Sequence, residues 1–247
     1  MRNIIISILT AVVVSTGLYF LFSDFLAFSI LIGIIAGAVV FILLVRSASK
    51  ELEVLNEKAQ KALYSQNFDR ALRIYESGLA LGKKSPFITG QIYGMIGMIH
   101  YMRKDFDKAK PALIKSSSMN WAAKGMLGVI YMNEKNYTEM DSTFKVMTTS
   151  GKKDGLSWGL YAFCLEKLNR KEEALKILEE GNKKLKDSDE RIKSNILELR
   201  NNRKMRMKVF GDNWYQFMLE RPPMKRMTQQ PGVAHQTGFK KNALYKG

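Results

Sequence analysis

The chain has 247 residues, with 39 Lys or Arg against 23 Asp or Glu, and so carries a formal net charge of +16. This length accommodates a membrane anchor plus one soluble domain whose core folds without disulfides or metals. The single cysteine, Cys164, excludes an intramolecular disulfide framework and favours the cytosolic side of a membrane. Residues 1–45 have no net charge, so the whole excess lies beyond them. Either the basic cytoplasmic part of a membrane protein or an anionic partner accounts for it.

Two uncharged stretches near the N-terminus, residues 4–22 and 25–45, are each about long enough to cross a hydrocarbon core of ~30 Å. A second apolar stretch directly after the first is not the pattern of a cleaved signal peptide, so the two predict a transmembrane helical hairpin. Arg2, Arg46 and Lys50 flank it, which places both termini in the cytoplasm. We expect the inner, plasma membrane of a bacterial cell.

Small residues recur every four positions in both stretches, and they suit either packing within the hairpin or dimerisation. They are Ser7, Ala11, Ser15, Ser29, Gly33 and Gly37.

Beyond residue 46 the apolar residues follow a helical period, and four segments repeat one pattern. Each opens with a residue suited to a turn or a helix start, then places a small or medium residue and, four positions later, a large one. Residues four apart share a helix face. Each pair therefore predicts a close helix crossing at the small residue, next to a large side chain that packs against the neighbouring helix. The segments start at Asn67, Asp105, Asn136 and Asn169, and the pairs are Ala71 and Tyr75, Ala109 and Leu113, Met140 and Phe144, and Ala174 and Leu178.

Another small residue lies twelve positions before each pair, at Ala59, Gly97, Gly128 and Ala162, and the spacings between units are 38, 31 and 34 residues. A helix with a small crossing point, a turn and a second helix form one helical hairpin. Over residues 52–187 this pattern resembles the tetratricopeptide repeat (TPR) family, whose unit has about 34 residues. The family's aromatic after the turn is matched at Phe68, Phe106 and Tyr137, but not at Lys171.

The expected fold is therefore all-α, in four parts. Residues 1–46 form the transmembrane hairpin and residues 47–187 form about four TPR-like helix pairs, an α-solenoid. Residues 188–221 form capping helices that cover its last apolar face. Residues 222–247 form a basic tail with little to bury, which we expect to be disordered.

Residues 91–102, QIYGMIGMIHYM, carry no charge but are too few to cross a bilayer, so they predict the first helix of the second unit. In the TPR family the first helices line a concave surface where peptides usually bind. The resemblance implies an apolar, methionine-rich partner-binding groove, suited to an apolar or amphipathic segment of another protein. Its residues are Gln91, Met95, Met98, Tyr101, Met102, Met126, Val129, Met132, Leu160 and Phe163.

The same strip has a second interpretation, in which a tight superhelix or the chain's own tail already fills it. Residues 188–210 predict an end helix that stops at Gly211. Residues 212–221 then predict a short, very apolar helix capped by Asp212, and such a helix must pack somewhere. At this point an open groove and a self-filled groove both remain.

The C-terminal part of the chain is strongly basic, since residues 200–247 hold eleven Lys or Arg against two acids, a net charge of +9. Near a membrane such a segment either stays solvated or contacts anionic head groups, at about 1 kcal/mol per basic residue. The residues for lipid contact are Arg203, Lys204, Arg206, Lys208, Arg221, Lys225 and Arg226. Nucleic-acid binding is not expected, because the basic residues are not interleaved with stacking aromatics.

No catalytic constellation is recognisable in the sequence. His100 has no second histidine or cysteine at metal-ligand spacing, and Cys164 lies in an apolar helix as a small hydrophobe. We expect no enzyme activity, no metal and no cofactor. Two functions remain: a membrane-anchored adaptor that captures a partner segment in the groove, and a membrane-surface protein that uses its basic tail on anionic lipids while the groove is self-occupied. The sequence does not indicate an oligomeric state.

Overall fold

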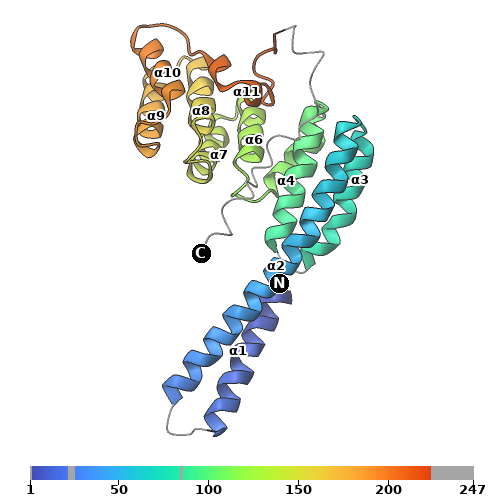
Figure 1. The fold of residues 1–247 in the computed structure, drawn as a ribbon. Coiled ribbons are helices and arrows are strands. Elements are labelled where there is room, and N and C mark those ends of the chain that lie inside the picture. Colours follow the sequence, from blue (N-terminus) through green and yellow to red (C-terminus); the bar gives the residue numbers. More distant parts are fainter. Residues whose placement is uncertain (1, 22–25, 84–85, 224–247) are drawn as a thin grey trace.

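The computed structural model describes residues 2–21, 26–83 and 86–223, and these residues form eleven α-helices and two 3-10 helices. Helices α1 (Arg2–Leu21) and α2 (Leu26–Tyr64) pack as a pair, and the helices that follow are paired in series (Figure 1). The all-α class and the series of helix pairs are therefore confirmed. The other bounds are α3 (Phe68–Gly78), η1 (Leu79–Lys83), α4 (Pro86–Met102), α5 (Phe106–Ile114), α6 (Trp121–Asn133), α7 (Tyr137–Ser150), α8 (Gly155–Lys167), α9 (Lys171–Lys184), α10 (Glu190–Arg200), η2 (Met207–Phe210) and α11 (Asp212–Tyr215).

Helices α1 and α2 are both long and apolar enough to cross a membrane. They approach each other along the stripe of small residues. A Cβ on Gly33 would lie 2.6 Å from the carbonyl oxygen of Ala11, and a Cβ on Gly37 would lie 2.9 Å from that of Ser7. Only glycine permits such close approach, so the small residues serve packing within the hairpin. The turn residues Ser23 and Asp24 lie outside the described part of the chain.

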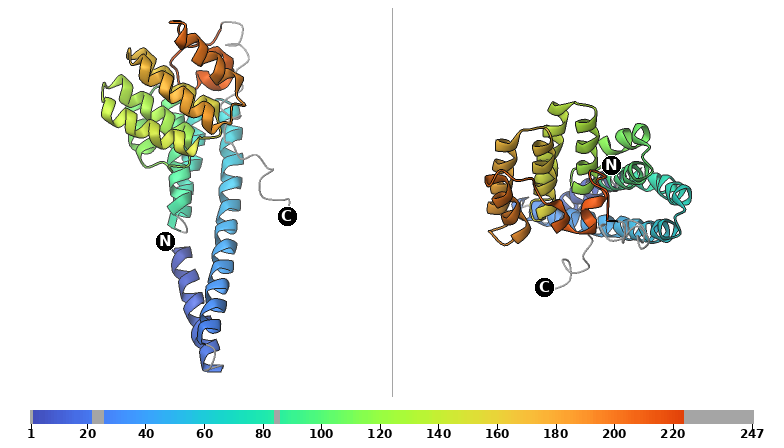
Figure 2. Two further views of the ribbon diagram at one scale, coloured as in Figure 1. Left: turned by 90° about the vertical axis from the view of Figure 1, so that its left-hand side faces the viewer. Right: turned by 90° about the horizontal axis from the view of Figure 1, so that it is seen from above.

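Helix α2 has 39 residues and is about 58 Å long at 1.5 Å per residue. Its second half is the first helix of the first pair, where Leu52, Ala59 and Leu63 are buried. Figure 2 shows α2 passing without a break from the hairpin into the paired helices. The sequence-predicted boundary at residues 46 and 47 therefore falls inside one helix, and the helix pairs are joined to the hairpin without a flexible linker.

The turns inside the four pairs share one geometry. Each contains a non-glycine residue in the left-handed region, and the N–H of the next residue donates to the carbonyl five positions earlier, as from Asn67 to Ala62 at 2.9 Å. The left-handed residues are Gln66, Lys104, Lys135 and Asn169, with φ of 55°, 61°, 61° and 59°. Four equal turns in succession identify a repeated structural unit.

Side-chain caps begin three of the second helices as the sequence predicts. Asn67, Asp105 and Asn136 each accept a hydrogen bond from the backbone N–H three residues on. In the fourth pair the segment opens with a turn residue instead of a cap, because Arg170 occupies the cap position and makes no side-chain cap bond. Asn169 is the left-handed residue before it, a conformation that asparagine tolerates well.

The predicted small and large residues interlock within each pair. The side chain of Leu113 lies over Gly97, where a Cβ would come within 2.7 Å of Leu113 Cδ2, and the ring of Phe144 lies similarly over Gly128. All twelve pattern residues are buried. Residues 91–102 belong to α4, which is a helix of this packed array, so their apolar character reflects burial on several sides.

Two predictions for the C-terminal part are wrong in extent. The end helix stops at Arg200, where Asn202 takes φ 58°, and does not continue to residue 210. The helix expected over residues 212–221 covers only Asp212–Tyr215, and Gly211, with φ 69°, holds the cap position in place of Asp212. The physical reason is that this part of the chain must bend to keep its apolar side chains against the helix pairs.

Candidate docking face and the C-terminal segment

A segment of irregular chain follows α10 and returns across the helix pairs. We call residues 203–221 the C-terminal segment. Figure 1 shows it, with η2 and α11, beside α8 and α10 at the end of the molecule away from α1. Five of its apolar side chains are at most 5 % exposed: Met205, Met207, Phe210, Trp214 and Phe217. The segment is therefore packed into the core of the paired helices over much of its length.

Side chains of three helices, α4, α8 and α10, bond directly to the backbone of this segment. The carboxylate of Glu166 on α8 accepts from the N–H of Met205 at 3.3 and 3.4 Å. The amide oxygen of Asn195 on α10 accepts from the N–H of Arg206 at 2.6 Å. The hydroxyl of Tyr101 on α4 donates to the carbonyl of Phe217 at 2.7 Å. Burial raises the pKa of Tyr101, so its hydroxyl stays protonated as the donor.

Aromatic side chains make the apolar part of the contact. The ring of Trp214 meets Phe163 of α8 edge-on at 4.8 Å, and the ring of Phe217 lies 6.3 Å from Trp121 of α6. Trp214 also lies 6.3 Å from Phe217, so the two rings of the segment contact each other as well as the helices. Offset and edge-on ring pairs of this kind add stabilisation beyond their buried area.

Two glycines make room for the rings of the segment. A Cβ on Gly125 would lie 2.8 Å from Phe217 Cε1, and a Cβ on Gly159 would lie 2.9 Å from Phe210 Cε2. Any other residue at either position would push a ring outward. We define the docking face as the residues of α4, α6, α8 and α10 that hold the segment: Tyr101, Trp121, Gly125, Gly159, Phe163, Glu166, Arg191 and Asn195.

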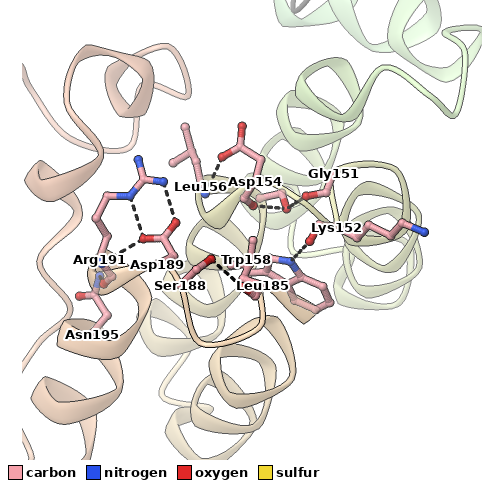
Figure 3. Close-up of polar contacts among 11 residues, drawn as sticks. Gly151, Lys152, Asp154, Leu156, Trp158, Leu185, Ser188, Asp189, Arg191 and Asn195 are labelled. Atoms are coloured by element: carbon pink, nitrogen blue, oxygen red, sulfur yellow. Dashed lines mark hydrogen bonds and ion pairs between the residues drawn. The ribbon is translucent and has the colours of Figure 1, made fainter. Parts of the chain in front are cut away.

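Helix α10 is fixed by a polar cluster at its start, which Figure 3 shows together with the loop before α8. Asp189 caps α10 by accepting from the N–H of Arg191, and it also binds the guanidinium of Arg191 through both oxygens. The hydrogen bonds from Arg191 hold the pKa of Asp189 below its usual value. The guanidinium lies 4.9 Å from the ring centre of Phe210, so this ion pair also supports the segment.

The ten residues predicted for a partner groove lie on α4, α6 and α8, and two of them, Tyr101 and Phe163, belong to the docking face itself. Six of them are at most 4 % exposed and share one apolar cluster with Trp214 and Phe217: Met98, Tyr101, Met126, Val129, Leu160 and Phe163. The other four are partly buried: Gln91, Met95, Met102 and Met132. Six of the ten predicted residues are thus buried within the same chain in this structure, and partner binding at the strip stays a prediction.

The polar and glycine residues of the docking face were missed by sequence reasoning. Gly125 and Gly159 are separate from the glycines of the repeat pattern, and this is a signal that a second close contact exists on α6 and α8. Asn195 was overlooked because α10 was interpreted only as an end cap. Glu166 was overlooked because it is a single acid at the end of an apolar helix, and an acid in that position usually lies in solvent.

Those residues predicted for lipid contact that the structure describes do not lie near the candidate spans. Arg203, Lys204, Arg206, Lys208 and Arg221 are exposed, whereas Lys225 and Arg226 lie outside the described residues. Figure 1 shows η2 and α11 at the end opposite α1. Electrostatic attraction to a bilayer around α1 would be screened within about 8 Å at physiological salt. Lipid contact by these residues stays a prediction that the geometry does not favour.

Burial shifts the pKa of two titratable groups outside the docking face. His100 lies 3.6 Å from Asp105, and burial lowers its pKa. Cys164 is fully buried in α8, which raises the pKa of its thiol. Within the described residues, no three His, Cys, Asp or Glu are grouped so as to hold a metal ion. Neither a protein-family model nor a curated protein matches this chain.

Proposed function

We propose that this chain is a membrane-anchored scaffold of the TPR family, which binds an apolar or amphipathic segment of a partner protein at the cytoplasmic face of a bacterial inner membrane. The observation that carries the proposal is the docking face itself. In this chain it accepts an aromatic-rich, irregular segment through ring contacts and side-chain hydrogen bonds to the backbone. A partner segment of the same chemistry would meet the same groups.

The continuous helix α2 supports the scaffold role. With no flexible linker between the hairpin and the first pair, the docking face is held at a set distance and orientation from the bilayer. The four equal turns and the interlocked small and large residues support kinship with the TPR family. Basic residues after the second span, Arg46 and Lys50, support the cytoplasmic orientation.

Photo-crosslinking in native membranes tests the proposal. A photoreactive residue replaces Met95 or Met132, which border the docking face and are only partly buried, while Val146 on the outer helix α7, 41 % exposed, serves as the control. We expect adducts with one distinct protein from the first two positions and not from the third. These adducts should disappear when a synthetic peptide of residues 203–221 is added in excess. Adducts confined to this chain's own C-terminal segment would overturn the adaptor function and leave the alternative of a basic tail on anionic lipid.

A further inference from the structure

We infer that the C-terminal segment is an intramolecular ligand of the docking face, and that a partner binds only by displacing it. The inference rests on the proposed function and adds its regulation, since the contact is autoinhibitory. It also specifies the partner: a segment with two aromatic residues three positions apart, as Trp214 and Phe217 are, and with a main-chain carbonyl free to accept from Tyr101.

The docking face holds the segment in the way that a binding surface holds a peptide. Its backbone is bonded by side chains of Tyr101, Glu166 and Asn195, and these come from three different helices. A helix that belongs to the repeated array is held differently, by interlocking side chains along its whole face. Side-chain bonds to an irregular backbone are what a binding surface uses when its ligand has no regular structure of its own.

The segment also has little internal structure to lose. Its two helices, η2 and α11, have four residues each. Gly211 and Met218 both take positive φ, and for Met218 this conformation is strained. Release would relax that strain and return the three polar side chains of the docking face to water. The connection to α10, Asn201 and Asn202, is exposed, so it does not hold the segment in place by packing.

The helix pairs also have contacts that do not involve the segment. Within each pair a small residue receives a large one, as Gly97 receives Leu113 and Gly128 receives Phe144. A second apolar cluster, built from α2, α3, α4 and α5, contains no residue of the segment. Detachment therefore uncovers the docking face and leaves these contacts intact.

Specific cleavage of the connection tests the inference on the full chain in detergent micelles. A recognition site for a specific protease is inserted between Asn201 and Asn202, and a fluorescent peptide of residues 203–221 serves as the probe. After cleavage we expect the native fragment to stay bound, to exchange with the probe, and to leave the helical circular dichroism unchanged. The uncleaved chain should bind the probe far more weakly, because its own segment is present at a high effective concentration.

Two variants make the test specific. A probe with W214A and F217A should bind at least 100-fold more weakly than the native probe. In the uncleaved chain Trp214→Ala weakens only the chain's own segment and leaves the docking face unchanged, so binding of the native probe should rise up to about 100-fold with unchanged helix content. Loss of helical signal when the fragment leaves, or failure of the probe to exchange, would overturn the inference and make the segment a permanent part of the core. Exchange supports it even where crosslinking finds no partner, so the two proposals fail separately.

Discussion

Replacing Trp214 with alanine should loosen the C-terminal segment more than any other single change. Its side chain is completely buried, its ring contacts Phe163 and Phe217, and its indole N–H donates to Glu220 at 2.7 Å. Truncating a buried tryptophan costs about 3–5 kcal/mol. We take the lower figure, because a segment that can move relaxes into part of the vacated space. At about 1.4 kcal/mol per factor of ten, about 3 kcal/mol raises the undocked population about 100-fold.

Limited trypsin digestion measures this population. The segment contains the cleavage sites Arg206 and Lys208, and the backbone at Arg206 is hydrogen-bonded to Asn195 while the segment is docked. If opening and closing are fast compared with cleavage, the cleavage rate follows the open fraction. Val209→Ala, in the same segment but 39 % exposed, is the matched control and should change the rate less than twofold. A change below threefold for Trp214→Ala would refute the role of this ring in holding the segment.

Three further predictions concern the thiol, the acid at α10 and the hairpin. Cys164 should resist alkylation by iodoacetamide in the folded chain, since burial raises the pKa of its thiol, and rapid labelling would contradict its packing in α8. The folded-state pKa of Asp189 is lowered, so the carboxylate stabilises the fold above the ordinary carboxyl pKa, and this stabilisation is lost as pH falls through the lower folded value. Below about pH 4 the wild type should therefore lose more of its stability against urea than Asp189→Asn loses. Equal losses would count against the ion pair with Arg191. Gly37→Leu should separate α1 from α2 and lower the thermal unfolding temperature in micelles. Gly17→Leu is the control, because a Cβ there would have no neighbouring atom within 4 Å, and it should leave the unfolding temperature unchanged. Equal effects of the two substitutions would show that the glycine contact does not hold the hairpin together.

The repeated unit was predictable because its signal is local. A small residue, a turn and a large residue sixteen positions after the small one fix how two neighbouring helices cross, and Gly97 with Leu113 behaves as this pattern requires. The ends of elements were less predictable where one residue type suits two roles. Asparagine suits a helix cap and a left-handed turn position equally well, and in the structure Asn169 takes the left-handed position.

The contact between the C-terminal segment and the docking face could be anticipated only in part. The apolar residues Trp214 and Phe217 required a place to pack, but their partners on α6 and α8 are 50 or more residues earlier in the chain. Nothing in a single sequence specifies which of several apolar surfaces such a segment covers. The irregular backbone of the segment could not be predicted for the same reason. The bends at Gly211 and Met218 follow from the shape of the docking face and not from local propensity.

The length of α2 limits what can reach the docking face. After Arg46, at the end of the predicted span, the helix continues for 18 residues to Tyr64, about 27 Å along its axis at 1.5 Å per residue. Figure 2 shows the last helices at the far end of that extension. A partner that is itself embedded in the bilayer must therefore separate its docking segment from its last span by about eight residues of extended chain, or about eighteen residues of helix. Under the proposed function, a partner segment that lies flat in the head-group region would be too low to contact Tyr101 or Phe163, so the expected partners are soluble proteins or membrane proteins with an extension beyond the bilayer.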